Sequence, residues 1–137
     1  MVTPESSASH GDSTGIISVG TSGSVADAVA RLARVIEERG LKVFAIIDHS
    51  GEAARAGLEL RNTRVVIFGS PSAGTPVMDA QPLAALDLPL KVLVWDDAGQ
   101  TTLSYTDPVV LAERHKLTPE LAARLAGIGP LVDAVVG

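Results

Sequence analysis

Three short clusters in this sequence place a histidine or a tyrosine beside charged residues, and each could take part in chemistry. They are Asp48-His49, Tyr105 with Asp107, and Arg114-His115. A histidine near the end of a strand can be a general base, a metal ligand or a hydrogen-bonded structural residue. A polar residue at the end of a helix can simply bond backbone carbonyls. The clusters therefore predict candidate positions without defining a reaction.

A fourth candidate is the segment 69–76 (GSPSAGTP), which lies between two apolar segments that we expect to be strands. Its content of glycine, proline and serine predicts an irregular loop rather than regular structure. Loops held on a rigid scaffold often carry function, and backbone N–H groups here could hold a phosphate or carboxylate. The structural alternative is that the glycines only permit sharp turns. The candidate ligand-binding residues are His49, Gly69, Ser70, Gly74, Thr75, Tyr105 and His115.

Several kinds of site find no support in the sequence. The chain has no cysteine, which excludes disulfides, thiol nucleophiles and cysteine-ligated metals. It has no phosphate-binding loop followed by lysine and no dinucleotide glycine pattern after a strand. His49 and His115 are far apart in the sequence and form no ligand motif, so no metal site is predicted and the cofactor remains open.

The composition is that of one globular domain. The 137 residues are 46% hydrophobic and 20% charged, and only 3% are aromatic, so the core must be aliphatic. A net charge of −5 argues against a nucleic-acid partner, which requires a basic face. No apolar run approaches the ~20 residues that span a bilayer, and the N-terminus has no secretory pattern. We therefore expect a soluble cytoplasmic protein.

The chain order predicts an α+β fold. Residues 1–14 read as a disordered tail and residues 15–137 as a single domain. A strand at 16–19 precedes a helix that begins at Ser24, has a capping box with Asp27 and ends at Gly40. Further strands are expected at 41–48, 63–68, 92–95 and 101–105, and short helical turns at 52–56 and 77–86, the latter broken at Pro82. Helices are expected to begin at Asp107 and at Thr118, the last one continuing through Leu131.

The central strands are apolar on both faces, in VVIF (65–68) and VLVW (92–95). A sheet with one face in water would alternate apolar and polar residues instead. Helices can cover one face, and we expect a partner chain to contribute to the other. This pattern favours a symmetric homodimer.

Several runs resemble the bacterial and archaeal domain-of-unknown-function family 302. They are FAIIDHSGEAA (44–54), GLEL (57–60), VIFGSP (66–71), AGTPVM (73–78), DLPLKVLVW (87–95) and 104–111 with Arg114-His115. The resemblance implies a TATA-binding-protein-like fold, a curved antiparallel sheet of about five strands with helices packed on one face, commonly dimeric. It implies no established activity. The family's recurring polar positions fall on His49, Thr75, Tyr105 and His115, while Ser70 stands where an asparagine is common.

Three classes of function remain open. The first is a homodimeric domain that binds a small anionic or aromatic molecule in a pocket lined by His49, Tyr105, His115 and the segment 69–76. The second is a small enzyme in which His49 or His115 acts as general acid or base, which requires two titratable groups at one cavity. The third is an accessory protein-interaction module, which requires an apolar patch that remains exposed after dimerisation.

Overall fold

A computed structural model describes residues 14–137, and the predicted tail lies almost entirely outside the described residues. Five strands form one open sheet: β1 (Ile16–Thr21), β2 (Lys42–Asp48), β3 (Thr63–Gly69), β4 (Leu90–Asp97) and β5 (Gln100–Thr106). The order across the sheet is β1-β5-β4-β3-β2, and all neighbours are antiparallel. The strands β1 and β2 are therefore its two edges.

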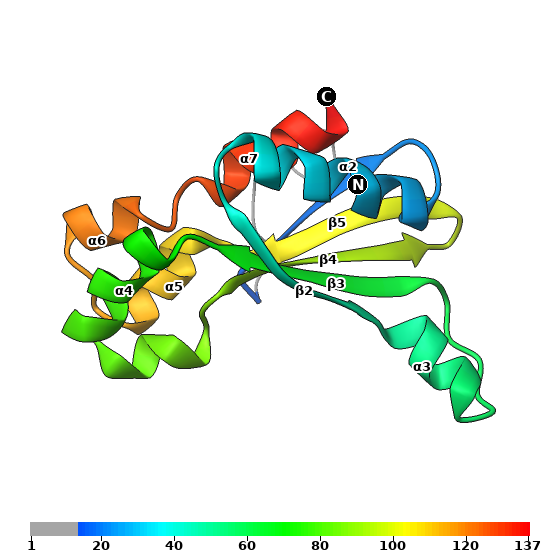
Figure 1. The fold of residues 1–137 in the computed structure, drawn as a ribbon, viewed down its shortest axis with the longest axis horizontal. Coiled ribbons are helices and arrows are strands. Elements are labelled where there is room, and N and C mark those ends of the chain that lie inside the picture. The colour runs from blue at the N-terminus through cyan, green and yellow to red at the C-terminus, as the bar shows by residue number, and fades with distance from the viewer. Residues whose placement is uncertain (1–13) are drawn as a thin grey trace.

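Two helices cover one face of this sheet, as Figure 1 shows at the top of the view: α2 (Val25–Glu38) and α7 (Ile128–Val136). The predicted capping box is confirmed, because the Ser24 side chain accepts from the Asp27 N–H and the Asp27 side chain accepts from the Ser24 N–H. Gly40 follows α2 with φ +75°, the left-handed conformation that favours glycine. The apolar stripe of α2 packs against β3 and β4 in the main core, which includes Leu32, Ile36, Val66, Phe68, Val92, Val94, Leu103 and Leu131.

The opposite face of the central strands carries no helix of the described chain (Figure 1). Val65, Leu93 and Trp95 are half-buried there. The Trp95 indole N–H donates to the Ser104 hydroxyl at 2.9 Å, and Ser104 bonds the Ser18 hydroxyl at 2.7 Å. The structure of one chain thus confirms the α+β fold, an antiparallel sheet with helices on one face. The other face of the central strands is not covered by a helix of the described residues.

A second, smaller group of helices lies beyond one end of the sheet, at the left of Figure 1. It comprises α4 (Pro71–Ala80), the 3-10 helix η1 (Pro82–Leu86), α5 (Pro108–Arg114) and α6 (Pro119–Ala123). A separate core lies among them and consists of Val77, Ala84 and Leu111 with Leu125, which follows α6. The expected break at Pro82 is confirmed, and Asp107 and Thr118 cap α5 and α6 as predicted.

Three sequence-based expectations are wrong. The segment 69–76 is not an irregular loop, because α4 begins within it: Pro71 fits the first helical turn, where no N–H bond is needed. The helix after β2 is α3 (His49–Arg55), which is capped by Asp48 and begins three residues before the helical turn expected at 52–56. The last helix is divided into α6 and α7, with residues 124–127 between them.

Candidate functional site

A cavity of about 120 Å³ lies where β3 passes into α4. Its walls come from four separate segments of the chain, namely β2, the end of β3 with α4, the start of β4 with the residues before it, and the two residues that follow α6. The lining residues are Phe44, Gly69, Ser70, Pro71, Ala73, Gly74, Met78, Leu88, Pro89, Leu90, Arg124 and Leu125. Among them only Arg124 is charged, so the cavity is an apolar space with one cation at its boundary.

Two glycines keep this cavity open. A Cβ atom at Gly69 would lie 3.7 Å from both the Phe44 ring and Pro89 Cβ, and one at Gly74 would have only Met78 Cε nearby, at 3.8 Å. Neither position has the positive φ that would itself require glycine. The backbone conformation therefore does not require glycine at either position. The space that the absent side chains leave forms part of the cavity.

The position of Arg124 is linked to the sequence of α4. Pro76 lies inside this helix and has no N–H to donate to the carbonyl one turn earlier, that of Ser72. The Arg124 guanidinium donates to this Ser72 carbonyl at 3.5 Å. Among the described residues Arg124 belongs to no ion pair. Its guanidinium is thus held beside the cavity and keeps unused donors.

The structure brings three of the predicted residues to the cavity and places the other four elsewhere. Gly69, Ser70 and Gly74 line it. Thr75 is exposed on α4 and does not line it. Tyr105 is 6% exposed in the main core, close to Gly129. Burial raises the pKa of the Tyr105 hydroxyl, and the charges of Asp133 and Asp107 raise it further, so this side chain is a neutral phenol at pH 7.

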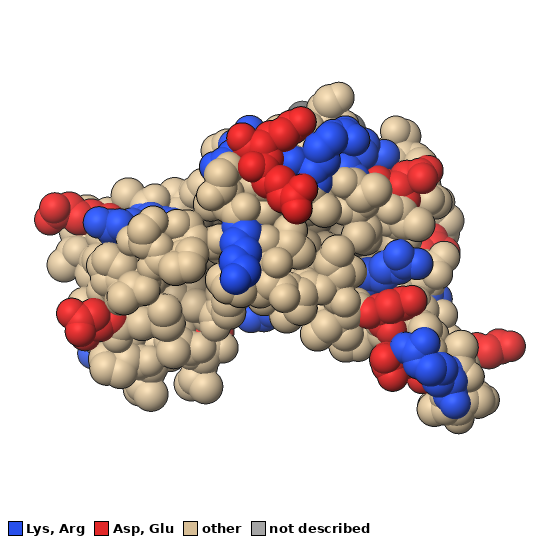
Figure 2. Space-filling view, viewed as in Figure 1, with Lys and Arg blue, Asp and Glu red and all other residues tan. Residues whose placement is uncertain are grey.

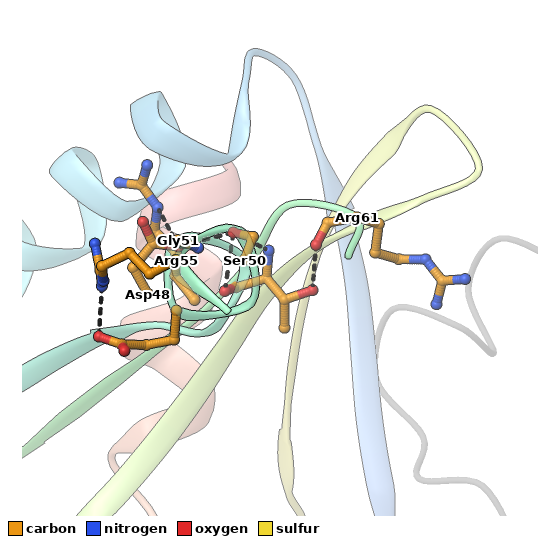
Figure 3. A network of polar contacts seen from close by, with 8 residues as sticks. Asp48, Ser50, Gly51, Arg55 and Arg61 are labelled. Carbon is orange, nitrogen blue, oxygen red and sulfur yellow. Dashed lines mark hydrogen bonds and ion pairs between the residues drawn. The ribbon is translucent and has the colours of Figure 1, made fainter. Parts of the chain in front are cut away.

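His49 is exposed at the first position of α3, next to a network that fixes the start of this helix (Figure 3). Asp48 accepts hydrogen bonds from the Gly51 N–H at 2.9 Å and from the Ser50 hydroxyl at 2.7 Å. The Ser50 hydroxyl in turn accepts from the Thr63 N–H at 3.2 Å. The bonds from Gly51 and Ser50 lower the pKa of Asp48. The carboxylate beside His49 is therefore a helix cap rather than a free acid.

His115 follows α5, and its side chain is 9% exposed. Its Nε2 lies 2.6 Å from Asp87 Oδ2, which also accepts from Arg114 at 3.1 Å. Burial alone would raise the pKa of Asp87, but the hydrogen bonds from His115 and Arg114 outweigh it and the pKa is lowered. Asp87 directly follows η1, so this contact joins η1 to the end of α5.

Replacing Asp87 by asparagine is expected to destabilise the protein by about 1–2 kcal/mol at pH 7, because His115 and Arg114 lose a charged acceptor. The lowered pKa means that the unfolded chain takes up the Asp87 proton at a higher pH than the folded chain. This stabilisation is therefore complete above a pH of about 4 and is lost as the pH falls through the lowered folded-state value. Denaturant unfolding at pH 7 and between pH 2 and 5 measures it. Asp79→Asn, at an exposed position of α4, is the matched control; equal behaviour of the two variants would contradict this role.

The two candidate histidines, His49 and His115, do not meet. The helices α3 and α5 lie at opposite ends of the long axis in Figure 1, and neither His49 nor His115 lines the cavity. Among the residues that the structure describes, no group of three or more His, Asp or Glu side chains could hold a metal ion. This cavity therefore has neither His49 nor His115 in its lining as a general acid or base.

The sequence reasoning missed Phe44, Met78, Pro89, Arg124 and Leu125 as lining residues. They come from segments far apart in the chain, and none carries a local motif. The hydrogen bond from Arg124 to the Ser72 carbonyl also has no signal in the sequence, because it depends on how the end of α6 lies beside α4.

This one-sided antiparallel sheet with a cavity at its end defines a small α+β domain, and comparison with known proteins identifies its family. The chain belongs to the family described as domain of unknown function DUF302, whose model matches residues 17–132. A crystal structure of an uncharacterized conserved DUF302 protein from Bacillus stearothermophilus matches 90% of this chain and 97% of its own, with a TM-score of 0.76 and 19% identity. That likeness confirms the fold.

Curated relatives at 39% identity over 129 residues carry the name of a fluoride-specific ion channel. Two of them are FluC 1 of Brucella suis and FluC 1 of Brucella abortus, and the match covers 90% of this chain and 51% or 48% of theirs. The chain thus spans about half the length of the curated relatives it matches. Within residues 14–137, no helix has the length and apolar character needed to cross a membrane.

Proposed function

We propose that this chain is a homodimeric domain that binds a small molecule in the cavity between β3, α4 and the end of α6. The observation that supports it most directly is the combination of an apolar lining with the single cation Arg124. Binding sites for small molecules are typically apolar spaces with a few polar groups that fix orientation. The glycines at positions 69 and 74 supply the space, and Arg124 supplies the orienting group.

The volume of the cavity limits the size of the ligand. A cavity of about 150 Å³ accommodates one benzene ring, so 120 Å³ suits a single ring or a short branched chain. An anionic group on such a molecule could remain at the opening and accept from Arg124. The ligand class that we propose is therefore a small aromatic or aliphatic carboxylate.

The homodimer is supported by apolar surface that one chain leaves uncovered. The open sheet face presents half-buried Leu93 and Trp95, and Phe44, Ile46 and Ile47 of β2 are exposed. Large contiguous apolar surface on a soluble domain marks an interaction site. A second copy of this chain is present wherever the protein is, and we propose it as the partner that covers this surface.

Titration with 3-phenylpropionate and with its neutral amide tests the pocket and the role of Arg124. The carboxylate is expected to bind about tenfold more tightly than the amide, because a charge-assisted hydrogen bond contributes about 1.5 kcal/mol. Arg124→Gln should reduce the carboxylate to the affinity of the amide. The matched control is Arg34→Gln, an exposed arginine on α2. Amide NMR shifts at Gly69 and Gly74 report the site, and equal affinities in the wild type or shifts confined to other residues would contradict the proposal.

A second candidate is an accessory domain that works with a fluoride-specific ion channel. The observation that favours it is the match to about half of each Brucella relative, together with the uncovered sheet face. Fluoride efflux from liposomes that contain the unmatched half of the Brucella suis protein, measured with and without this chain, tests it. A change in the efflux rate supports this role, and an unchanged rate argues against it.

A further inference from the structure

A second cation, Lys42, lies close to the cavity, although it does not line it. Lys42 is the first residue of β2 and pairs directly with Gly69, a lining residue at the end of β3. Directly opposed residues of an antiparallel pair project to the same face of the sheet. The Lys42 side chain therefore leaves β2 on the side where a side chain at Gly69 would stand, which is the side of the cavity.

The Phe44 ring connects this cation to the cavity. The register between β2 and β3 shifts between Val43 and Ala45, so Phe44 lies at a bulge. Bulges often re-aim a side chain beside a functional site, and here a Cβ atom at Gly69 would lie 3.7 Å from the Phe44 ring. The ammonium of Lys42 lies 5.2 Å from the centre of the same ring. Because an aromatic face attracts a cation, this wall of the cavity holds Lys42 beside it.

No carboxylate of the described chain competes for the Lys42 ammonium. Lys42 belongs to none of the ion pairs in this part of the chain, and the lining of the cavity contains no acidic residue. In Figure 1 the start of β2 crosses in front of the other strands, and in Figure 2 a basic side chain interrupts a largely uncharged surface there. Lys42 is exposed, and the flexible stem of a lysine lets its ammonium follow an anion at the opening.

The cavity thus has cations at two different walls. Arg124 follows α6 and is held by its hydrogen bond to the Ser72 carbonyl, whereas Lys42 lies beside the β2 wall. A monocarboxylate neutralises only one of them. We infer that the ligand of this cavity is a small dicarboxylate, whose apolar middle fills the cavity while one carboxylate accepts from Arg124 and the other from Lys42. This inference rests on the small-molecule site of the proposed function and narrows its ligand to a dianion.

Two probes of equal size that differ by one charge test the role of Lys42. They are 3-(4-carboxyphenyl)propionate and its ring carboxamide, 3-(4-carbamoylphenyl)propionate. The dicarboxylate should bind about three- to fivefold more tightly, the difference typical of an ion pair with an exposed lysine, and this difference should shrink at high ionic strength. Lys42→Gln should remove the difference and Lys42→Arg should retain it. The matched control is Lys116→Gln, at an exposed position after α5, which should also retain it.

The readout is the ratio of the two affinities within each variant, with amide NMR shifts at Gly69 and Gly74 as the evidence that binding occurs in the cavity. Equal affinities of the two probes for the wild type, or an unchanged ratio in Lys42→Gln, would overturn the dicarboxylate inference. The proposed small-molecule site would stand in that case, because both probes still bind there. Failure of both probes to shift Gly69 and Gly74 would overturn the site and the inference together.

Discussion

Replacing Gly74 by leucine is expected to weaken the binding of a small carboxylate to this protein at least about tenfold without destabilising it. Gly74 lies in the interior of α4, where its missing side chain leaves the space next to Met78 open. A leucine side chain would fill much of a cavity of only 120 Å³. At the same time leucine favours a helix over glycine by about 0.5–1 kcal/mol, so the midpoint of thermal unfolding should stay equal or rise.

The measurement is the affinity for 3-phenylpropionate, which should fall at least about tenfold, since the loss of roughly 1.4 kcal/mol of contact has that effect. The matched control is Ala54→Leu, which adds a side chain of the same kind to the exposed surface of α3. Unchanged affinity in a folded Gly74→Leu variant would show that the ligand, if it binds, uses another site.

Replacing Phe68 by alanine should have the largest effect on stability. Phe68 is 1% exposed near the end of β3, where it packs in the main core with residues of α2. Removing a fully buried phenylalanine side chain costs about 3–5 kcal/mol, because the lost apolar contacts are joined by the cost of the cavity that remains. This is a large part of the 5–15 kcal/mol that typically stabilises a domain.

The chain offers its own control, because it has two phenylalanines and the other, Phe44, is 42% exposed. Phe44→Ala removes the same atoms and should cost the monomer about 1 kcal/mol, as expected for a partly buried side chain. Urea unfolding measures both variants. Similar losses in the two would contradict the assignment of Phe68 to the main core.

The sequence predicted the strands and most of the points where elements begin or end, because the signals for these are local. The capping box at Ser24 and Asp27, the end of α2 at Gly40 and the break at Pro82 each depend on residues within a few positions. The turn at Ala98-Gly99 joins β4 to β5 with positive φ at both residues, as a two-residue hairpin requires. Apolar β-branched runs then define the strands between these points.

The site was less predictable, because distant packing overrides local composition there. The glycine, serine and proline content of residues 69–76 indicated a loop, yet Val77 is fully buried in the second core and holds the segment as α4. Tyr105 is buried in the main core and His115 contacts Asp87, so neither side chain lines the cavity. Arg124 has no signal in the sequence because its role depends on the carbonyl that Pro76 leaves without a donor.

The proposed small-molecule site is tested most directly by native mass spectrometry of the protein purified from its own host, beside the Gly74→Leu variant. We expect the wild type to carry an additional mass of a small organic acid that Gly74→Leu lacks, with both proteins folded. Identification of this mass would define the ligand and the site together. A wild type without any bound mass that also fails to bind 3-phenylpropionate would contradict the proposed function.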